Sequence, residues 1–354
     1  MRSVVVPFDP AQLPAPLRRI TPPEVLTRWC APDRAPHAPR VVAVPGAGGW
    51  TAAALVTARP ATAYVKIVDA VGDVPSAVAA VVSRARDQGL AQVKWEGWTA
   101  SPEDAAGAGF TPLRLPLTGG GDGPGTGHVR WLGGEEVPEP PYYRQSTDFT
   151  CGAVTALVAR VLAGALPPTS LDRTTELTLW RDATNFPACE PVGLGVAVRR
   201  RGTASPVEVF LDTDRPVLLA HLPEPEREWR AVLQRASRTE AGRFGVPVTT
   251  RRLSLTRVRE AVQSREQVLL LVSLAAMQGY DVPHWVLCHG AVPGAVVLED
   301  PWFRAAAGET WVDAHLLPVP DAALETMSLL TEDGARFRGA VRVGRADRTE
   351  AVDA

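Results

Sequence analysis

The sequence predicts an α+β protein in which a small α/β module precedes a larger domain, and three observations lead to this fold class. Residues 41–117 alternate between strand-like runs and a helical pattern. The stretch 118–136 is rich in glycine and has the composition of a flexible linker. Residues 137–345 place a cysteine at the start of an apolar helix and follow it much later with strand-like segments. At 354 residues the chain can hold two domains with a sizeable core.

The N-terminal third carries the signals of the smaller module. Residues 1–40 are rich in proline and weakly patterned, so we expect one short helix there, within Thr21–Cys30, where prolines suit the first turn. In the module itself, strands are expected over 40–44, 52–57, 63–68 and 90–96, and a short helix over 102–110. Val74–Gly89 predicts a longer helix, because its valines recur at helical spacing and a glycine ends it. At the other end of the chain, residues 346–354 are expected to form a tail.

The second part of this module, from the helix of 74–89 to the ending Ala-Ala-Gly-Ala-Gly-Phe110, resembles the second half of an acetyltransferase fold of the GNAT type. In that family a glycine-containing loop before the helix holds the pyrophosphate of acetyl-CoA. Here Asp69-Ala-Val-Gly-Asp73 stands in that place, and its carboxylates would repel phosphate. We therefore interpret residues 41–117 as a degenerate, non-catalytic remnant and expect no cofactor.

The composition argues against several classes of partner. The net charge is −2 and the isoelectric point is about 6.3, so the chain has no excess of basic residues that would indicate binding to nucleic acid or to an anionic membrane. The N-terminus has only a short apolar run before Pro7, whereas a secretory signal needs a longer one. No apolar stretch of the sequence is long enough to span a bilayer. We expect a cytoplasmic protein without nucleic-acid or membrane partners.

The cysteines point to the same compartment. There are four, at positions 30, 151, 189 and 288, and none forms a CxxC pair. Four cysteines spread over so long a chain are not a disulfide framework, which fits a reducing compartment. A zinc site built from His284, Cys288 and His289 would lack a second ligand pair at the usual spacing, so we expect no metal.

Cys151 opens the predicted helix, which runs to about residue 163; Gly152 follows it directly, and Gln145 precedes it by six residues. The apolar residues of the helix form a broad stripe, so we expect it to be buried. A helix N-terminus carries roughly half a positive charge, which lowers the pKa of a nearby thiol. The Cys151 backbone N–H and the Gln145 amide would be two donors for an oxyanion, and Gly152 would keep the approach to the sulfur open. A buried core cysteine would show the same pattern, so the interpretation needs a second set of residues.

That second set is His284, which follows a proline, and Asp300, which precedes one. Two strand-like runs joined by a turn at 292–295 predict a β-hairpin that carries both. A three-residue loop would place Asp300 opposite Val286, on the face shared with His284, whereas a two-residue loop would place it on the other face. In the favourable register the carboxylate accepts from Nδ1–H and leaves Nε2 for the thiol.

With these residues in order, the chain resembles the papain-like C39 peptidases, and more closely their C39-like cytoplasmic relatives. The resemblance rests on Tyr143-Arg-Gln-x5-Cys151-Gly152 before a helix, then Pro283-His284-Trp-Val, then Asp300-Pro301, and on a middle segment over 176–202. It covers about 137–345. It implies a papain-like fold, in which the cysteine helix packs on an antiparallel sheet that carries the histidine and the aspartate.

Carried over residue by residue, the resemblance implies Cys151 as nucleophile, His284 as general base and acid, Asp300 as its orienter and Gln145 as oxyanion donor. The chain departs from the exporter-linked members of the family, which usually have Asp adjacent to the cysteine, where Phe149-Thr150 stands here. The sequence also holds no ATP-binding cassette or membrane domain of such an exporter. Leader-peptide cleavage coupled to export is therefore not expected.

Three functions remain open at this point. The leading one is a cysteine-dependent hydrolase, a peptidase or amidase, that forms a thioester on Cys151 and resolves it with water. An acyltransferase or transpeptidase would use the same residues with an amine or thiol as acceptor, and a catalytically decayed protein would only bind peptides. The expected partner is a peptide or acyl-amide substrate, and Trp180, Trp285 and Trp302 are candidates to line its groove. The oligomeric state does not follow from the sequence.

Overall fold

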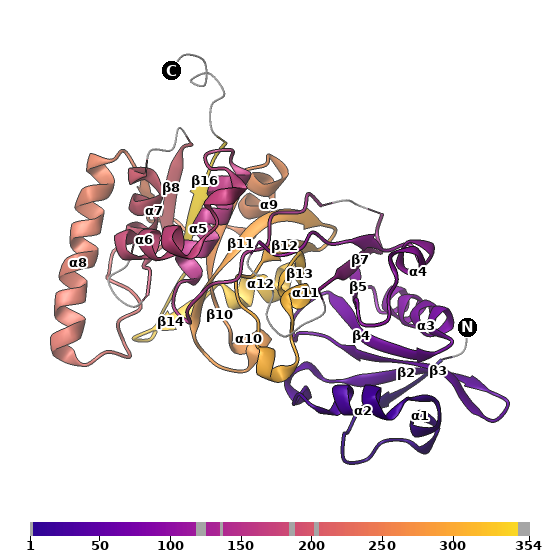
Figure 1. The fold of residues 1–354 in the computed structure, drawn as a ribbon. Helices are drawn as coiled ribbons and strands as arrows, with labels where there is room; N and C mark the ends of the chain where they lie inside the picture. Colours follow the sequence, from indigo (N-terminus) through magenta and orange to yellow (C-terminus); the bar gives the residue numbers. More distant parts are fainter. Residues whose placement is uncertain (1–2, 118–124, 135–136, 184–187, 202–204, 346–354) are drawn as a thin grey trace.

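The computed structural model describes residues 3–117, 125–134, 137–183, 188–201 and 205–345. Two seven-stranded sheets lie next to each other, one in the N-terminal part of the chain and one in the C-terminal part (Figure 1). Both are mainly antiparallel and are covered by helices, which confirms the predicted α+β class. The predicted tail of 346–354 and much of the predicted linker, 118–124 and 135–136, lie outside the described residues.

The N-terminal sheet has the strand order β1-β2-β3-β4-β5-β7-β6. Its strands are β1 (Val4–Pro7), β2 (Arg40–Gly46), β3 (Gly49–Thr57), β4 (Tyr64–Gly72), β5 (Gln92–Glu96), β6 (Thr111–Pro112) and β7 (Gly127–Trp131). The pair β4–β5 is parallel because α3 (Val74–Asp87) crosses between the two strands. α4 (Pro102–Gly107) leads into β6.

Alternation along β3 gives this sheet two buried faces. Ala54 and Val56 pack with the valines and alanines of α3, whereas Leu55 points the other way. That second face is covered by Leu17 of α1 (Ala15–Ile20) and Trp29 of α2 (Pro23–Cys30), before a 3₁₀ turn, η1 (Ala35–His37). The helices over 23–30 and 74–87 thus lie where the sequence predicts them.

The sheet reaches beyond the predicted bounds of 41 and 117. β1 pairs with β2, so the proline-rich first 40 residues supply a strand and a second helix in addition to the one predicted. β7, which pairs with β5, lies within the stretch 118–136 that the sequence predicts as a linker. Neither strand has a local pattern strong enough to mark it in the sequence. The division of the chain into domains stays a prediction, as does the likeness to an acetyltransferase.

The C-terminal sheet has the order β13-β12-β11-β10-β16-β8-β9. Its strands are β8 (Val207–Leu211), β9 (Val248–Thr249), β10 (Gln267–Ser273), β11 (Pro283–Val292), β12 (Ala295–Glu299), β13 (Leu317–Pro320) and β16 (Gly339–Val343), and β14 (Leu330–Glu332) forms a separate hairpin with β15 (Ala335–Phe337). Within the seven-stranded sheet, only the short pair β8–β9 is parallel among the described residues.

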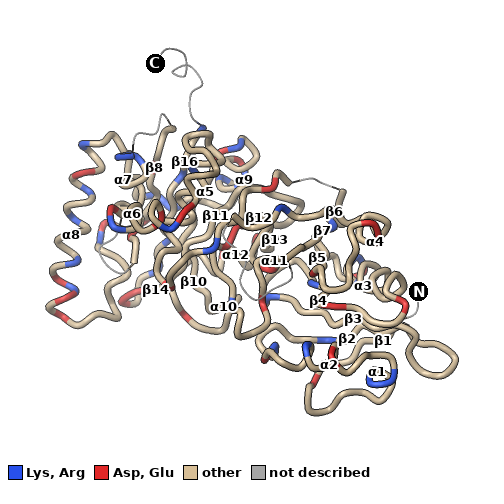
Figure 2. The backbone as a smooth tube through the Cα atoms, in the orientation of Figure 1, with Lys and Arg blue, Asp and Glu red and all other residues tan. Residues whose placement is uncertain are grey.

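Helices cover both faces of this second sheet. One face packs against α5 (Cys151–Leu162), α6 (Arg173–Ala183) and α7 (Pro191–Arg200). The other packs against α9 (Leu255–Gln263), α10 (Ala275–Gln278) and α12 (Asp321–Met327). The remaining elements are α8 (Glu224–Arg243), α11 (Trp311–Ala314), η2 (Pro168–Ser170) and η3 (Ala305–Ala307). Acidic and basic side chains alternate along the exposed α8 (Figure 2), which contains the ion pair Arg230–Glu226.

An apolar cluster joins the two sheets. It combines Leu113 and Val129 of the N-terminal part with Val297, Trp311 and Val312 of the C-terminal part. The backbone N–H of Ala63, in the loop between β3 and β4, also donates to the carbonyl of Pro318 in β13. The junction is therefore packed and hydrogen-bonded, so side chains of the N-terminal sheet can reach into the C-terminal part.

Candidate active site

Cys151 is the first residue of α5, as the sequence predicts. The helix is buried over 151–160, because alanine, valine and leucine side chains surround its axis and pack against β10 and β11. The hydroxyl of Thr155 donates to the carbonyl of Trp285 in β11 at 3.2 Å. This packing holds the helix N-terminus, and with it the sulfur, against the start of β11.

Gly152 has a packing role that the sequence analysis did not identify. A Cβ at this position would lie 3.0 Å from Cδ1 of Trp285 and 3.1 Å from Cβ of Cys189. The glycine therefore lets α5 approach these two residues closely, and its effect on access to the sulfur stays a prediction. Trp285 is fixed on the same side, since its indole N–H donates to the Cys189 carbonyl at 2.9 Å.

The segment that leads into α5 is organised by Glu176, a fully buried residue of α6 that the sequence analysis missed. Its carboxylate accepts from the Tyr143 hydroxyl at 2.9 Å and the Ser146 backbone N–H at 2.8 Å. It also accepts from the hydroxyl of Thr150, which occupies the N-cap position of α5 without making a side-chain cap. Three bonds to one carboxylate thus shape the loop between Gln145 and Cys151.

The hairpin has the register that brings Asp300 to the face of His284, although its turn has two residues and not three. β11 and β12 are joined by the two-residue turn Pro293–Gly294, which on its own would put Asp300 on the wrong face. A β-bulge between Cys288 and Gly290 adds one residue to β11 and shifts the pairing by one, so that Leu287 pairs with Glu299. The next step along the ladder brings Asp300 level with Val286. The bulged residue, His289, could not be identified from local patterning.

Asp300 lies directly beside His284, with Oδ1 2.8 Å from Nε2 of the imidazole. The prediction that Nδ1 faces the carboxylate is therefore wrong, and Nδ1 is the ring nitrogen left for the thiol. The side chains of His284 and Cys151 are hydrogen-bonded to each other. Cys151, His284 and Asp300 thus form one chain of polar contacts, with the carboxylate fully buried and only 9% of Cys151 exposed.

Each of these three side chains shifts the pKa of its neighbour toward the charged form. Burial would raise the pKa of Cys151, but the charge and hydrogen bond of His284, with backbone N–H groups of Trp285 and Gly152, lower it overall. Burial would likewise lower the pKa of His284, yet Asp300 and Cys151 raise it to about 10. Against the effect of its own burial, Asp300 has a lowered pKa because of His284 and a nearby arginine. The imidazole of His284 is therefore protonated at neutral pH, and its charge favours the thiolate form of Cys151.

Gln145 reaches the same region through the backbone. Its N–H donates to the carbonyl of Pro301, next to Asp300, at 2.9 Å. Its side-chain Nε2 donates to the Thr147 carbonyl at 2.7 Å, and the second amide hydrogen has no partner within the described part of the chain. A hollow of about 440 Å³ adjoins Gln145 and is lined by residues 143–148, Arg173 and Trp302.

A sequence model described as Peptidase_C39 like family matches residues 140–344. The chain belongs to the C39-like peptidase family. A crystal structure from Bacillus anthracis, titled as a candidate C39-like peptidase, is similar with 11% sequence identity and a TM-score of 0.33, over 60% of this chain and 100% of that one. No curated protein matches the chain. The cysteine helix on an antiparallel sheet that carries His284 is the papain-like arrangement expected for this family.

Arg59 is the second residue of this C39-like protein that the sequence analysis missed. It lies in the loop between β3 and β4 of the N-terminal sheet, and its Nη1 is 2.6 Å from Oδ2 of Asp300. Both side chains are completely buried. The two residues are 241 positions apart, and no local pattern marks such a pair.

Two other cysteines of this C39-like protein, Cys288 and Cys30, have different surroundings from Cys151. Cys288 is fully buried among apolar residues on the far side of β11, and burial raises its pKa. Burial is also the main reason that the pKa of the half-buried Cys30 is raised.

Among the described residues, no group of three His, Cys, Asp or Glu side chains is placed to hold a metal ion. No helix in the described part of the chain is long and apolar enough to cross a membrane.

The tryptophans that were candidates to line a groove differ in position. Trp285 is 2% exposed and belongs to the core. Trp180 packs at the edge of that core with its ring centroid 5.0 Å from that of Phe149. Trp302, two residues after Asp300, lines the hollow beside Gln145.

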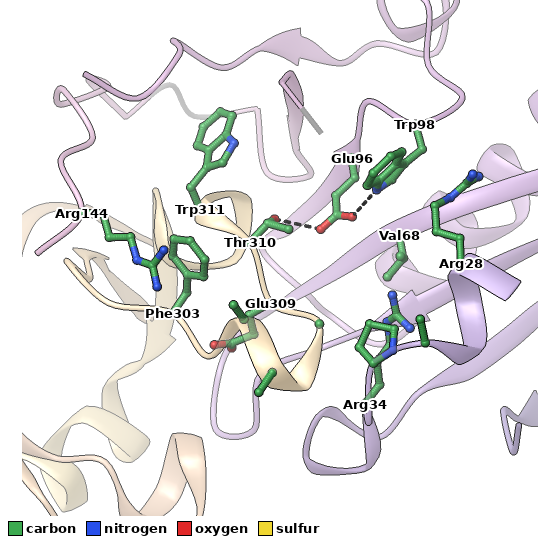
Figure 3. A pocket seen from close by; sticks show the side chains of 15 residues that line it. Arg28, Arg34, Val68, Glu96, Trp98, Arg144, Phe303, Glu309, Thr310 and Trp311 are labelled. Carbon is green, nitrogen blue, oxygen red and sulfur yellow. Dashed lines mark hydrogen bonds between the residues drawn. The ribbon is translucent and has the colours of Figure 1, made fainter. Parts of the chain in front are cut away.

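A second cavity, of about 510 Å³, lies at the junction of the two sheets (Figure 3). Arg28, Arg34 and Trp98 face it from the N-terminal part, and Arg144, Phe303 and Trp311 face it from the C-terminal part. Neither Cys151 nor His284 is among the described residues that line it. This cavity is therefore separate from the sulfur.

Proposed function

We propose that this C39-like protein is a cysteine-dependent hydrolase that cleaves peptide or other amide bonds, with Cys151 as nucleophile. The observation that carries the proposal is the buried chain from Cys151 through His284 to Asp300, in which the thiol pKa is lowered although burial alone would raise it. A structural cysteine has no need of such a partner, as Cys288 illustrates.

The reaction begins with the thiolate of Cys151 attacking the carbonyl carbon of the substrate. The resulting oxyanion is stabilised by the Cys151 backbone N–H and the free hydrogen of the Gln145 amide, and each such donor contributes roughly 2.7–4 kcal/mol. His284 then donates its proton from Nδ1 to the departing amine, which leaves a thioester on Cys151. Asp300 keeps the ring oriented throughout and balances its charge.

Water completes the cycle. His284, now neutral, removes a proton from a water molecule, which attacks the thioester carbonyl. Collapse of the second tetrahedral intermediate releases a carboxylic acid and returns the proton to the pair of Cys151 and His284. The net change is one amide bond broken and one water consumed. If an amine replaces the water, the product is a new amide instead of an acid.

A mixed peptide library in water enriched in ¹⁸O tests the proposal. We expect the full-length protein to generate new C-termini that carry one ¹⁸O atom, as read by mass spectrometry, because the oxygen comes from solvent. Cys151→Ala should abolish these products, whereas the matched variant Cys288→Ala should retain them. Products that persist in Cys151→Ala, or a new amide bond without ¹⁸O, would contradict a Cys151-dependent hydrolase.

A further inference from the structure

The N-terminal part of the chain places a charged side chain, Arg59, directly against Asp300 of the candidate active site. Arg59 stands two residues after β3, in a loop that is fixed at both ends. On one side the Ala58 backbone N–H donates to the His37 carbonyl at 3.2 Å, and on the other the Ala63 N–H donates to the Pro318 carbonyl at 2.8 Å. The Thr62 hydroxyl also donates to the Arg59 carbonyl at 2.5 Å. The backbone below the guanidinium is therefore held in place.

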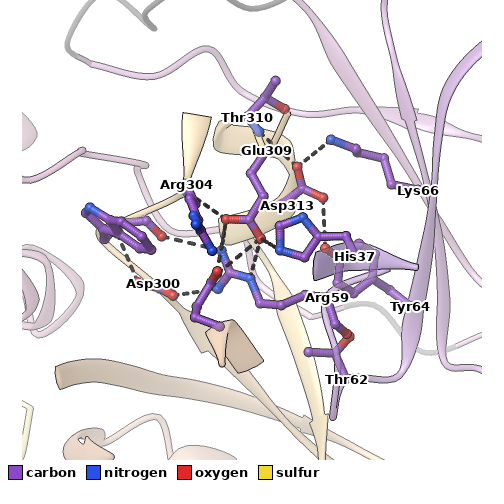
Figure 4. A network of polar contacts seen from close by, with 12 residues as sticks. His37, Arg59, Thr62, Tyr64, Lys66, Asp300, Arg304, Glu309, Thr310 and Asp313 are labelled. Atoms are coloured by element: carbon purple, nitrogen blue, oxygen red, sulfur yellow. Dashed lines mark hydrogen bonds and ion pairs between the residues drawn. The ribbon is translucent and has the colours of Figure 1, made fainter. Parts of the chain in front are cut away.

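The guanidinium bridges two carboxylates of the C-terminal part (Figure 4). Nη1 lies 2.6 Å from Oδ2 of Asp300, Nε donates to Oε1 of Glu309 at 2.7 Å, and Nη2 donates to Oε2 of Glu309 at 3.1 Å. Glu309 is in turn bound by the Arg304 backbone N–H at 2.7 Å and by the Gln278 amide at 3.1 Å. Burial would lower the pKa of Arg59, but the two carboxylates outweigh that effect and raise it.

The two oxygens of Asp300 are thereby divided between two cations. Oδ1 accepts from His284 and from the Trp302 backbone N–H at 2.9 Å, and Oδ2 accepts from Arg59. Burial and Asp300 also raise the pKa values of Tyr142 and Tyr280, for Tyr280 to about 12. At the other end of the network, Nε2 of the buried His37 lies 3.3 Å from Oε1 of Glu309. Both phenols thus stay neutral at neutral pH, and the ion chain runs from Glu309 through Arg59, Asp300 and His284 to Cys151.

We propose that Arg59 is a positioning residue of the active site, so that the N-terminal sheet completes the Cys151–His284–Asp300 chain rather than merely covering it. This inference rests on the proposed function. Asp300 is anchored on the side away from His284 by Arg59, which keeps the carboxylate ionised and directs Oδ1 at the imidazole. When Asp300 takes up a proton, His284 loses its anionic partner and the thiolate is no longer stabilised.

The geometry explains why arginine rather than lysine occupies this position. The planar guanidinium presents donors in a fixed fork, and here the fork meets Glu309 with two nitrogens while the third reaches Asp300. A lysine ammonium would keep one positive charge but could not hold both carboxylates in the same plane. Arg59→Lys should therefore preserve part of the effect and Arg59→Gln none of it.

The competing explanation is that Arg59 only holds the two sheets together. Lys66 offers a matched control, because it too is completely buried, comes from the N-terminal sheet and crosses the junction. It pairs with Asp313 and Glu96 and makes no contact with Asp300 among the described residues. A purely structural role predicts the same behaviour for variants at both positions.

The test uses the full-length protein and needs no known substrate. The rate of alkylation of Cys151 by iodoacetamide is followed by mass spectrometry from pH 4 to 9 in the wild type, Arg59→Gln, Arg59→Lys and Lys66→Gln, with thermal unfolding measured in parallel. For Arg59→Gln we expect the acidic limb of the profile to move up by about one pH unit, which is a roughly tenfold lower rate at pH 5. Arg59→Lys should shift less in the same direction, and Lys66→Gln should stay within about twofold.

Equal shifts in Arg59→Gln and Lys66→Gln, or no shift in either, would overturn the proposal. If Arg59→Gln does not fold, the Arg59→Lys profile decides, and failure of both variants to fold would assign Arg59 to stability alone. The inference and the proposed function fail differently. A wild-type Cys151 that reacts no faster than Cys30 contradicts the proposed function, whereas a reactive Cys151 with an unchanged profile in the Arg59 variants contradicts only the inference.

Discussion

Two fully buried basic side chains, Lys94 in one sheet and His284 in the other, respond to burial in opposite ways. Lys94 of the N-terminal sheet donates to backbone carbonyls of Asp313 and His315, at 3.1 and 2.6 Å, and burial lowers its pKa to about 7. His284 of the C-terminal sheet is just as buried, but a carboxylate and a thiolate flank it and raise its pKa to about 10. Burial penalises the charged form in both cases.

The difference shows what distinguishes a reactive site from a buried polar cluster. Near Lys94, the charges of Arg59 and Lys66 oppose those of Asp313 and Glu299, so attraction to the carboxylates does not offset the desolvation. Around His284 each charge has an opposite neighbour, in the order Cys151, His284, Asp300 and Arg59. A buried charge therefore persists at the second site, where chemistry can use it.

The largest loss of activity is expected when His284, the charge between Cys151 and Asp300, is removed. His284→Ala removes the charge that offsets the burial of Cys151, so the thiol pKa should rise and the thiolate should vanish at neutral pH. Loss of a residue in such a unit typically costs about 10⁴-fold or more in turnover. We expect peptide cleavage to fall by at least about 10³-fold, measured as initial rates on any substrate found in the library.

His289→Ala is the matched control for this change, since His289 lies in the same strand and is also buried. Its pKa is lowered to about 3, by burial and then by His315, so it carries no charge for Cys151 to use. Similar losses in both variants would mean that the effect of His284 comes from packing and not from its charge.

A somewhat smaller effect should follow from removing the carboxylate that faces His284. Asp300→Asn keeps the size of the side chain but removes the charge that raises the pKa of His284. We expect the rate of Cys151 alkylation at pH 6 to fall by about 10²-fold, because the imidazolium loses its anionic partner. Alkylation read by mass spectrometry measures this without a substrate.

Deletion of His289 is the matched control within the hairpin. It removes the bulge but leaves Leu287 paired with Glu299, so Asp300 stays level with Val286. We expect the alkylation rate to stay close to that of the wild type. A deletion variant as unreactive as Asp300→Asn would instead show that the bulge itself is required.

A change at the junction should act on stability and leave the sulfur unaffected. Lys66→Gln leaves the buried carboxylates of Asp313 and Glu96 without their cation, which typically costs 3–5 kcal/mol. We expect the free energy of unfolding in urea to fall by about that amount. If the variant is as stable as the wild type, the junction does not depend on this ion pair.

The smallest effect in this set concerns Glu190, a buried carboxylate that, unlike Asp300, has no strong cation beside it. Burial raises its pKa to about 7, although the Val192 and Gly193 N–H groups oppose the shift. Between pH 4.5 and 7 the unfolded chain loses this proton while the folded protein keeps it, so stability falls as the pH rises. The loss should be about 3 kcal/mol across this window.

Urea unfolding at several pH values checks this, with Glu190→Gln as the comparison. The variant cannot titrate, so its stability should change less between pH 4.5 and 7 than that of the wild type. Parallel pH dependences in the two proteins would mean that Glu190 ionises normally despite its burial.

Much of this site could be predicted because the motif around Cys151 and the pair of His284 and Asp300 are local patterns. A polar residue at the start of an apolar helix and two polar residues at strand ends stand out against their neighbours. The ring nitrogen that faces Asp300 could not be predicted, because both orientations of an imidazole fit the same sequence. The sequence also left the loop length open; the loop has two residues, and the bulge at His289 offsets its effect on the register.

Arg59 and Glu176 were missed for a different reason. Each acts through contacts with residues far away in the chain, and an arginine after a strand or a glutamate in a helix is ordinary by local pattern. The same holds for β1 and β7, which join the N-terminal sheet by long-range pairing. Contacts of this kind depend on the packing of the whole molecule.

The most direct test of the central claim is the pH dependence of Cys151 alkylation by iodoacetamide in the wild-type protein, with Cys30 as internal reference. A thiolate held by His284 predicts a rate that stays nearly constant from pH 8 to pH 6, at least about tenfold above that of Cys30 at pH 6. A thiol of ordinary pKa, about 8.5, instead loses roughly tenfold in rate per pH unit over this range. If Cys151 follows that decline, the protein has no activated nucleophile and the account of its active site is wrong.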